Sequence, residues 1–313
     1  MLLGAVAFAF ILSYSDIGQV ATAFEHFPSV IVPLLFGLVV AREAIRVVEW
    51  RYLLARLKVR PRWRHTAEAL LAGDAGQILP AGIFLENYVL RQMEKVNVSR
   101  SLAATISMQF LEAGVALVVL AIVPIGNWWW LRWASIAVLI GFAAFLVLVT
   151  RQPVLRWIMG RDARGHFSGW LARQVEKFGE SVGGLLRPSI VLSAAVLTGA
   201  YLVPTIAILY VLAHSYHLDQ IGWLQAAVVY CFSLVIIILN PLPSDWGVSE
   251  GTGTAAFIAL RVSPAVGLTL MLLLRFTILL ATFALVGVVA AIFRQDVEEV
   301  VEGPPIGMGG PGS

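Results

Sequence analysis

Charged side chains are scarce in this sequence. Asp, Glu, Lys and Arg make up 13% of its 313 residues, whereas hydrophobic residues make up 59%, and the mean hydropathy is +0.85. Soluble domains carry about 25% charged and about 45–50% apolar residues, so the composition excludes a soluble globular domain and a disordered chain. Apolar runs of about 20 residues predict an all-α polytopic membrane protein rather than a barrel.

Cysteine and catalytic signatures are also missing. The one cysteine, Cys231, lies in an apolar run, which excludes an intramolecular disulfide and a cysteine metal site. The chain has no HExxH, Walker loop or paired metal-ligand motif. We therefore predict no catalytic residues, no metal site and no cofactor. The net charge of +3 is attributed to cytoplasmic loops rather than to nucleic-acid binding.

The apolar runs and their interruptions predict about six full spans and two irregular regions. The spans are residues 1–12, 28–48, 101–123, 130–150, 189–213 and 264–293. Residues 65–93 and 221–261 have apolar flanks broken by Pro, Gly and acidic residues. Such backbone at membrane depth must be buried in protein or line a cavity, so each region is predicted to be a re-entrant helical hairpin.

Positive charge orients the spans. Residues 51–64 carry six basic and no acidic residues, and residues 151–187 carry seven basic and three acidic ones, so both are predicted to be cytoplasmic loops. Residues 13–27 and 214–220 contain no Lys or Arg and are predicted to lie outside. The first hairpin then enters from the cytoplasm and the second from outside, and both chain termini are cytoplasmic. The alternative is that residues 221–240 cross fully and the C-terminus lies outside.

This order predicts a single membrane domain over residues 1–294, followed by an acidic and then Gly/Pro-rich tail over residues 295–313. The domain divides into halves 1–123 and 127–294, each with the order span, span, hairpin, span and with opposite orientation. Opposed hairpins in inverted halves are typical of alternating-access transporters. The interrupted regions also share a weak pattern of proline, glycine and glutamate.

Charges within the hydrocarbon region cost at least about a few kcal/mol each, so they are candidates for function. The predicted substrate-binding residues are Asp74, Glu86, Arg91, Glu112, Asp245, Glu250 and Arg275. Arg275 lies well inside the last span, and Glu112 is a candidate partner for it. The other interpretation is that these groups only pair with one another and with the broken backbone.

A second charged group lies at the inner end of the 28–48 span. Arg42, Arg46 and Glu49 fall on one helix face at positions i, i+4 and i+7. We interpret Arg42 and Arg46 as an inner vestibule that gathers anionic lipid headgroups. The alternative is a cluster of charges at the helix end that faces the headgroups.

The two interrupted regions resemble the transmembrane flippase region of the lysylphosphatidylglycerol synthase family and its stand-alone relatives. The matching residues are Leu79-Pro80-Ala81-Gly82, Glu86 and Arg91, then Pro241-Leu242-Pro243, Gly247, Glu250 and the mid-span Arg275. Leu85 precedes Glu86 where the family has Gly, and Ser244-Asp245 replaces a Gly-Gly pair. The resemblance covers residues 28–293. It implies movement of a lipid or lipid-linked group between leaflets. We expect no soluble synthase domain after the last span, so lysine transfer is not carried over from the family.

We therefore expect a flippase or translocase for a phospholipid or lipid-linked headgroup in a bacterial-type plasma (inner) membrane. Its expected partner is that membrane lipid, and we expect no binding of nucleic acid. The sequence leaves open whether the chain forms a homo-oligomer or binds a separate synthase. One alternative is an intramembrane lipid-modifying enzyme in which Asp74, Glu86 and Glu250 act as acid or base. The other is a membrane partner that positions a separate synthase or glycosyltransferase.

Overall fold

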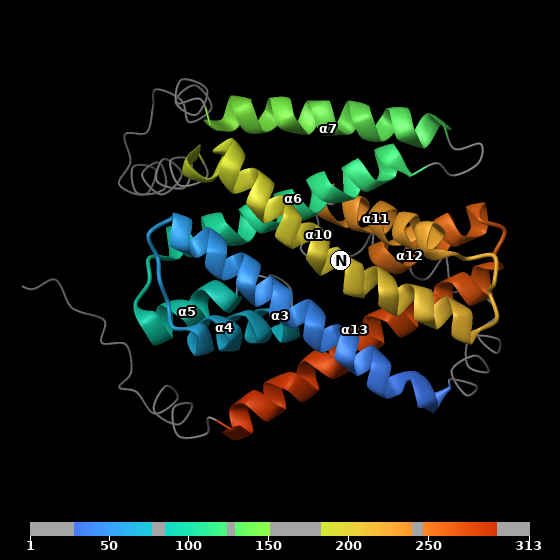
Figure 1. The fold of residues 1–313 in the computed structure, drawn as a ribbon, viewed down its shortest axis with the longest axis horizontal. Helices are drawn as coiled ribbons and strands as arrows, with labels where there is room; N and C mark the ends of the chain where they lie inside the picture. The colour runs from blue at the N-terminus through green and yellow to red at the C-terminus, as the bar shows by residue number, and fades with distance from the viewer. Residues whose placement is uncertain (1–27, 77–84, 124–128, 151–182, 240–246, 293–313) are drawn as a thin grey trace, which may run out of the picture.

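The computed structural model describes residues 28–76, 85–123, 129–150, 183–239 and 247–292. Within these ranges all regular structure is helical and no strand occurs, as the predicted all-α class requires (Figure 1). A short 3-10 turn, Ser29–Ile31, precedes the first long helix. The helices are α3 (Val32–Arg56), α4 (Trp63–Gly76), α5 (Leu85–Glu94), α6 (Val98–Ile122), α7 (Trp129–Thr150), α10 (Pro188–Ser215), α11 (Trp223–Leu239), α12 (Val248–Ala259) and α13 (Pro264–Ile292).

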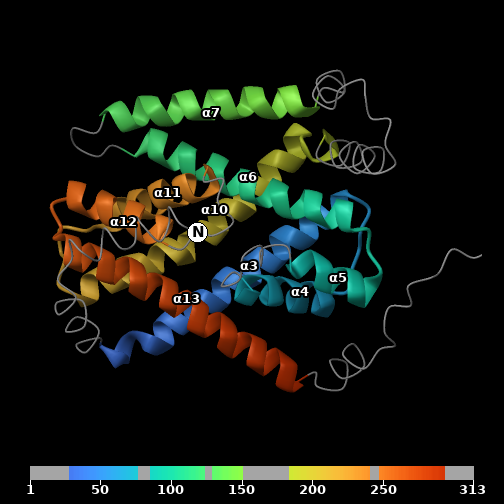
Figure 2. The ribbon, with the colours of Figure 1, turned by 180° about the vertical axis from the view of Figure 1, so that it is seen from behind.

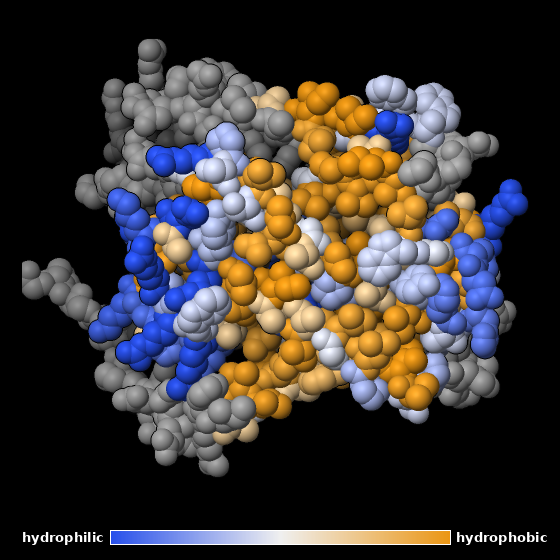
Figure 3. Space-filling view, in the orientation of Figure 1, coloured by the Kyte–Doolittle hydropathy of each residue, from blue (hydrophilic) through white to orange (hydrophobic). Residues whose placement is uncertain are grey.

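The long helices run between two opposite ends of the molecule. α3, α6, α7, α10 and α13 connect these ends, whereas the pair α4–α5 lies at one end and the pair α11–α12 at the other (Figures 1 and 2). Figure 3 shows an apolar band across the middle of the visible face with hydrophilic residues on both sides of it. A band of this kind is what a protein embedded in a bilayer presents to the lipid chains.

Three of the described helices are long and apolar enough to cross a membrane, namely α6, α10 and α13. α3 has 25 residues, or about 38 Å at 1.5 Å per residue, but four charged side chains lie between its residues 42 and 49. The first predicted span lies outside the described residues. The structure thus establishes a helical membrane protein, while the count of six spans stays a prediction.

The two interrupted regions each form a pair of short helices. α4 and α5 have 14 and 10 residues, or about 21 and 15 Å, and are therefore shorter than the roughly 30 Å of hydrocarbon in a bilayer. α11 and α12 have 17 and 12 residues. The members of each pair pack against each other. The breaks themselves, residues 77–84 and 240–246, lie outside the described residues.

The sequence predicts a cytoplasmic loop over the basic run 51–64, but the structure shows that part of this run is helical. α3 continues to Arg56 and α4 begins at Trp63, so Arg51 and Arg56 belong to the last turns of α3. The physical reason is the apolar face of these turns, because Trp50, Leu53 and Leu54 are buried. Arg51 itself packs its guanidinium over the ring of Trp63 at 4.2 Å.

Left-handed residues mark the ends of four helices. They are Lys58 after α3, Lys95 after α5, His217 after α10 and Arg261 after α12, with φ angles between 51° and 65°. A residue in this conformation terminates a helix, and the cationic side chains of Lys58, Lys95 and Arg261 suit this position because positive charge near the last carbonyls interacts favourably with the helix dipole. The chain can then reverse towards the next helix within a few residues.

The hydrophobic core has two parts. One part contains Trp50 of α3, Met108 of α6 and Ala194 of α10. The other contains Val39 of α3, Ala116 of α6, Leu202 of α10 and most of the core residues of α11 to α13. Each of the three shared helices passes from one part to the other within about three turns, and polar side chains occupy that interval.

Candidate functional site

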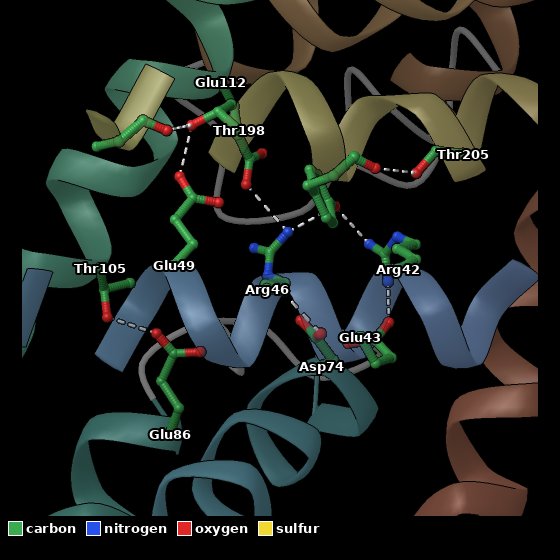
Figure 4. A network of polar contacts seen from close by, with 12 residues as sticks. Arg42, Glu43, Arg46, Glu49, Asp74, Glu86, Thr105, Glu112, Thr198 and Thr205 are labelled. Carbon is green, nitrogen blue, oxygen red and sulfur yellow. Dashed lines mark hydrogen bonds and ion pairs between the residues drawn. The ribbon is translucent and has the colours of Figure 1, made fainter. Parts of the chain in front are cut away.

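A buried polar layer lies between the two parts of the core, and Figure 4 shows most of its side chains. Its members come from α3, α4, α5, α6 and α10: Arg42, Glu43, Arg46, Glu49, Asp74, Glu86, Thr105, Glu112, Thr198 and Tyr201. On α6, Glu112 lies about 21 Å from the first residue and about 15 Å from the last, at 1.5 Å per residue. The layer is therefore near the middle of the long helices.

Two arginines on consecutive turns of α3 converge on one tyrosine. Arg42 Nη2 and Arg46 Nη1 each donate a hydrogen bond of 2.6 Å to the hydroxyl of Tyr201 on α10. Both guanidinium carbons also lie 4.9 Å from the centre of the tyrosine ring, within the range of cation–π attraction. Arg42 additionally pairs with its neighbour Glu43. Because Tyr201 is a neutral acceptor, it orders the arginines without cancelling their charge.

Arg46 connects four helices. Its Nη1 lies 3.0 Å from Oε1 of Glu112 on α6, and its Nε lies 3.8 Å from Oδ2 of Asp74 on α4. Together with its bond to Tyr201 on α10, these contacts join α3, α4, α6 and α10 through one side chain. A buried charge is stable only when it is paired and hydrogen-bonded, and Arg46 fulfils that condition.

Two other carboxyl groups of the layer are held by hydroxyl groups. Thr198 Oγ1 on α10 donates to Oε1 of Glu49 at 2.5 Å, and Thr105 Oγ1 on α6 donates to Oε1 of Glu86 at 2.5 Å. Asn87 Nδ2 also donates to Thr105 Oγ1, at 3.2 Å. Glu49 is fully buried and Glu86 is 2% exposed. Both carboxyl groups therefore lie in the protein interior and accept hydrogen bonds from neutral hydroxyl groups.

A glycine allows Glu86 to reach this position. A Cβ placed on Gly73 of α4 would lie 2.8 Å from both Cβ and Oε2 of Glu86, which is closer than nonbonded atoms approach. Gly73 therefore permits α4 and α5 to touch at Glu86, which lies in the first turn of α5. The close helix contact and the position of the carboxyl group depend on the same residue.

A second polar group lies at the α12–α13 contact. Arg275 Nη1 on α13 pairs with Oε1 of Glu250 on α12 at 2.7 Å. The other carboxyl oxygen of Glu250 accepts a hydrogen bond of 2.8 Å from the backbone N–H of Gly247, which has a left-handed φ of 81° at the start of α12. This carboxyl group caps the helix start and neutralises the arginine.

The structure brings most of the predicted site residues into these two groups. Asp74, Glu86 and Glu112 belong to the polar layer, and Glu250 and Arg275 form the second group. Arg91 is exposed on the last turn of α5. Asp245 lies outside the described residues.

Two sequence interpretations need correction. The candidate pairing of Arg275 with Glu112 does not occur, because Arg275 pairs with Glu250 and Glu112 with Arg46. The alternative in which the 42–49 charges face lipid headgroups at a helix end is also wrong. All four side chains are buried, because α10 and α6 cover this face of α3 with the partners described above.

Sequence reasoning missed Tyr201, Thr198 and Thr105. A signal for the first two was present: Thr198, Tyr201 and Thr205 are spaced i, i+3 and i+7 on one face of an otherwise apolar helix, and all three are buried. Such a polar stripe within a span marks a face that packs against protein. Among the described residues, no group of three His, Cys, Asp or Glu side chains is placed to hold a metal ion.

The sequence model of one family, described as the lysylphosphatidylglycerol synthase TM region, matches residues 1–287. This match covers both polar groups and every described helix except the last turns of α13. No curated protein matches the chain.

Proposed function

The chain belongs to the family of lysylphosphatidylglycerol synthase transmembrane regions, and on this premise we propose that it moves a phospholipid or lipid-linked headgroup between the leaflets of a bilayer. The observation that carries the proposal is the polar layer, which crosses an otherwise apolar bundle near mid-depth. Charged groups are rare inside membrane proteins and mark the paths of polar substrates. A lipid headgroup is a polar substrate that must pass this depth.

The chemistry of the layer suits a headgroup with a phosphate. Arg42 and Arg46 are hydrogen-bonded to the hydroxyl of Tyr201, which holds their charges in place. A headgroup phosphate would accept hydrogen bonds from other N–H groups of the same two guanidinium groups. Arginine binds phosphate through its planar fork of donors. The surrounding carboxyl groups suit an amine or hydroxyl of the same headgroup, and the acyl chains stay in lipid during the passage.

The arrangement of the short helices supports an alternating-access mechanism. We propose that α4–α5 and α11–α12 are re-entrant hairpins from opposite sides and that the chain consists of two inverted halves. Glu86 and Glu250 occupy equivalent places, since each lies in the first turn of the second helix of its pair. Each is also bound by a side chain of the following long helix, Thr105 or Arg275. Rocking of one half against the other would then open the layer to each side in turn.

Reconstitution tests this proposal. Purified protein is placed in phosphatidylcholine vesicles with fluorescent phosphatidylglycerol, phosphatidylethanolamine, aminoacylated or polyprenyl-linked lipids, and an impermeant quencher reports the lipid that reaches the outer leaflet. We expect at least one of these lipids to move faster than in empty vesicles, and to slow in an Arg46→Leu variant but not in an Arg100→Gln variant. Arg100 is exposed at the start of α6.

Two results would go against a flippase. If none of these lipids moves faster than in empty vesicles, the proposal fails. If mass analysis finds a chemically altered lipid instead of a relocated one, the intramembrane enzyme becomes the better account.

A further inference from the structure

The polar layer holds more acids than bases. It contains two arginines and five carboxyl groups, namely Glu43, Glu49, Asp74, Glu86 and Glu112. Arg42 pairs with Glu43, and Arg46 pairs with Glu112 and Asp74. Glu49 and Glu86 have no ion pair with any described residue. Full ionisation would leave an excess of three negative charges inside an apolar bundle, and a buried carboxyl group without a cation takes up a proton instead.

The immediate surroundings of Glu49 favour a neutral acid. Its Oε1 accepts the Thr198 hydroxyl, and its Oε2 is buried without a hydrogen-bond partner. The charged groups that act on it are Arg46 of its own helix and Glu112 of α6, while α10 contributes only the hydroxyl of Thr198. Since Arg46 is already engaged by Glu112 and Asp74, it does not neutralise Glu49.

Glu86 has similar surroundings on the opposite side of α3. The charged groups that act on it are Asp74 of α4, Glu112 of α6 and Arg46 of α3. Its Oε1 accepts the Thr105 hydroxyl, and its Oε2 lies against Gly73. Two acids and one shared arginine around a carboxyl group disfavour a further negative charge there.

From this charge balance and geometry we propose that Glu49 and Glu86 are proton-binding sites of the transport path, and that headgroup movement is coupled to their protonation. The coupling part rests on the proposed function. In the resting state each is a carboxylic acid. When an acid releases its proton to water at an open side, the resulting carboxylate competes with Glu112 and Asp74 for Arg46. That competition changes the contacts that hold α3, α4 and α6 together, so proton release and rearrangement of the layer are linked.

Infrared spectroscopy tests the protonation directly, without any lipid substrate. The protein is reconstituted in phosphatidylcholine vesicles, and difference spectra are recorded between neutral and alkaline buffers in H₂O and D₂O. We expect a carboxylic-acid C=O band at neutral pH that shifts in D₂O and weakens in each of Glu49→Gln and Glu86→Gln. The Glu94→Gln variant is the control, because Glu94 is a partly exposed carboxyl outside the layer. A spectrum without this band, or a band unchanged in both variants, overturns the proposal.

Lipid movement at different pH values tests the coupling. For a step that needs one proton, the wild-type rate changes by up to about tenfold per pH unit, and the Glu49→Gln/Glu86→Gln variant loses this dependence. A wild-type protein that moves lipid at the same rate at every pH would overturn the coupling and leave the flippase intact. A protein that shows the infrared band but moves no lipid would overturn the proposed function and, with it, the coupling. The assignment of Glu49 and Glu86 as proton-binding sites would still stand.

Discussion

Arg46 on α3 and Glu112 on α6 form an ion pair of 3.0 Å between the two parts of the hydrophobic core. The same guanidinium reaches Tyr201 and Asp74, so one buried side chain holds helices from separate parts of the sequence.

The first prediction concerns the ion pair itself. Arg46→Leu leaves the carboxyl group of Glu112 buried without its partner, and breaking such a pair costs about 3–5 kcal/mol. We expect Arg46→Leu to lower the free energy of unfolding in detergent by an amount of this order. Adding Glu112→Leu should restore part of the loss, because the unpaired carboxyl is removed. Equal destabilisation of the single and double variants would contradict the role of the pair.

The second prediction concerns Tyr201. Tyr201→Phe keeps the ring but removes the acceptor of two charged donors, and a hydrogen bond to a charged group contributes about 1.5–3 kcal/mol. We expect lower stability and slower lipid movement, measured by detergent unfolding and by the vesicle assay. Tyr210→Phe on the same helix is the control, since its ring contacts with His214 and Trp223 remain. If both variants behave like the wild type, the hydroxyl of Tyr201 does not order the arginines.

The third prediction concerns Gly73. In Gly73→Ala the new Cβ would collide with Glu86, and overpacking of this kind typically costs about 1–3 kcal/mol. We expect reduced stability together with a weaker carboxylic-acid band from Glu86. Gly114→Ala on α6 is a matched control, because nothing lies within 4 Å of its added Cβ. Indistinguishable effects of the two alanines would mean that α4 and α5 do not meet as described.

The fourth prediction concerns the second polar group. Arg275→Leu removes the arginine that pairs with the buried Glu250, and we expect lipid movement to stop while the helical content stays the same by circular dichroism. Arg275→Lys keeps the charge and should retain part of the activity. Unchanged movement in Arg275→Leu would remove this arginine from the transport path.

The fifth prediction concerns pH at one end of the bundle. Burial raises the pKa of Glu94, but hydrogen bonds from the Arg62 N–H and from His65 outweigh it, so the pKa lies below its ordinary value of 4.5. A lowered pKa in the folded state contributes stability above pH 4.5, and this contribution disappears as the pH falls through the folded pKa. Glu94→Gln should therefore destabilise the protein at neutral pH and have no effect at strongly acidic pH. Thermal unfolding at several pH values checks this, and a pH-independent difference would contradict it.

The helices and their interruptions could be predicted from the sequence. Residues 65–93 and 221–261 were recognised because Pro, Gly and acidic residues break apolar runs there, and each region is indeed a pair of short helices. Helix lengths follow from local signals such as the Asn97 side chain, which caps α6 by accepting from Ser99 N–H at 3.0 Å. The prediction that Arg42, Arg46 and Glu49 share one face of α3 was also correct, because helix periodicity alone determines which residues share a face.

The partners across helices could not be predicted in the same way. Spacing within one helix does not say which face of another helix it meets. Arg275 was therefore only a candidate partner for Glu112, which pairs with Arg46 in the structure. Tyr201 was missed because an aromatic residue in an apolar run looks like an ordinary hydrophobic residue of a span. Its hydroxyl meets the two arginines only because α10 packs against α3. The end of α3 was misplaced because a basic run resembles a loop even when its other face is buried.

The central claim is that a lipid headgroup passes through the polar layer, and cross-linking tests it most directly. Phospholipids with a photoreactive group on the headgroup are irradiated with the reconstituted protein, and mass spectrometry maps the modified residues. The account predicts adducts on α3, α6 and α10 around Arg46, Glu112 and Tyr201, reduced in Arg46→Leu. Adducts confined to the outer surface, such as the exposed face of α7, would contradict it.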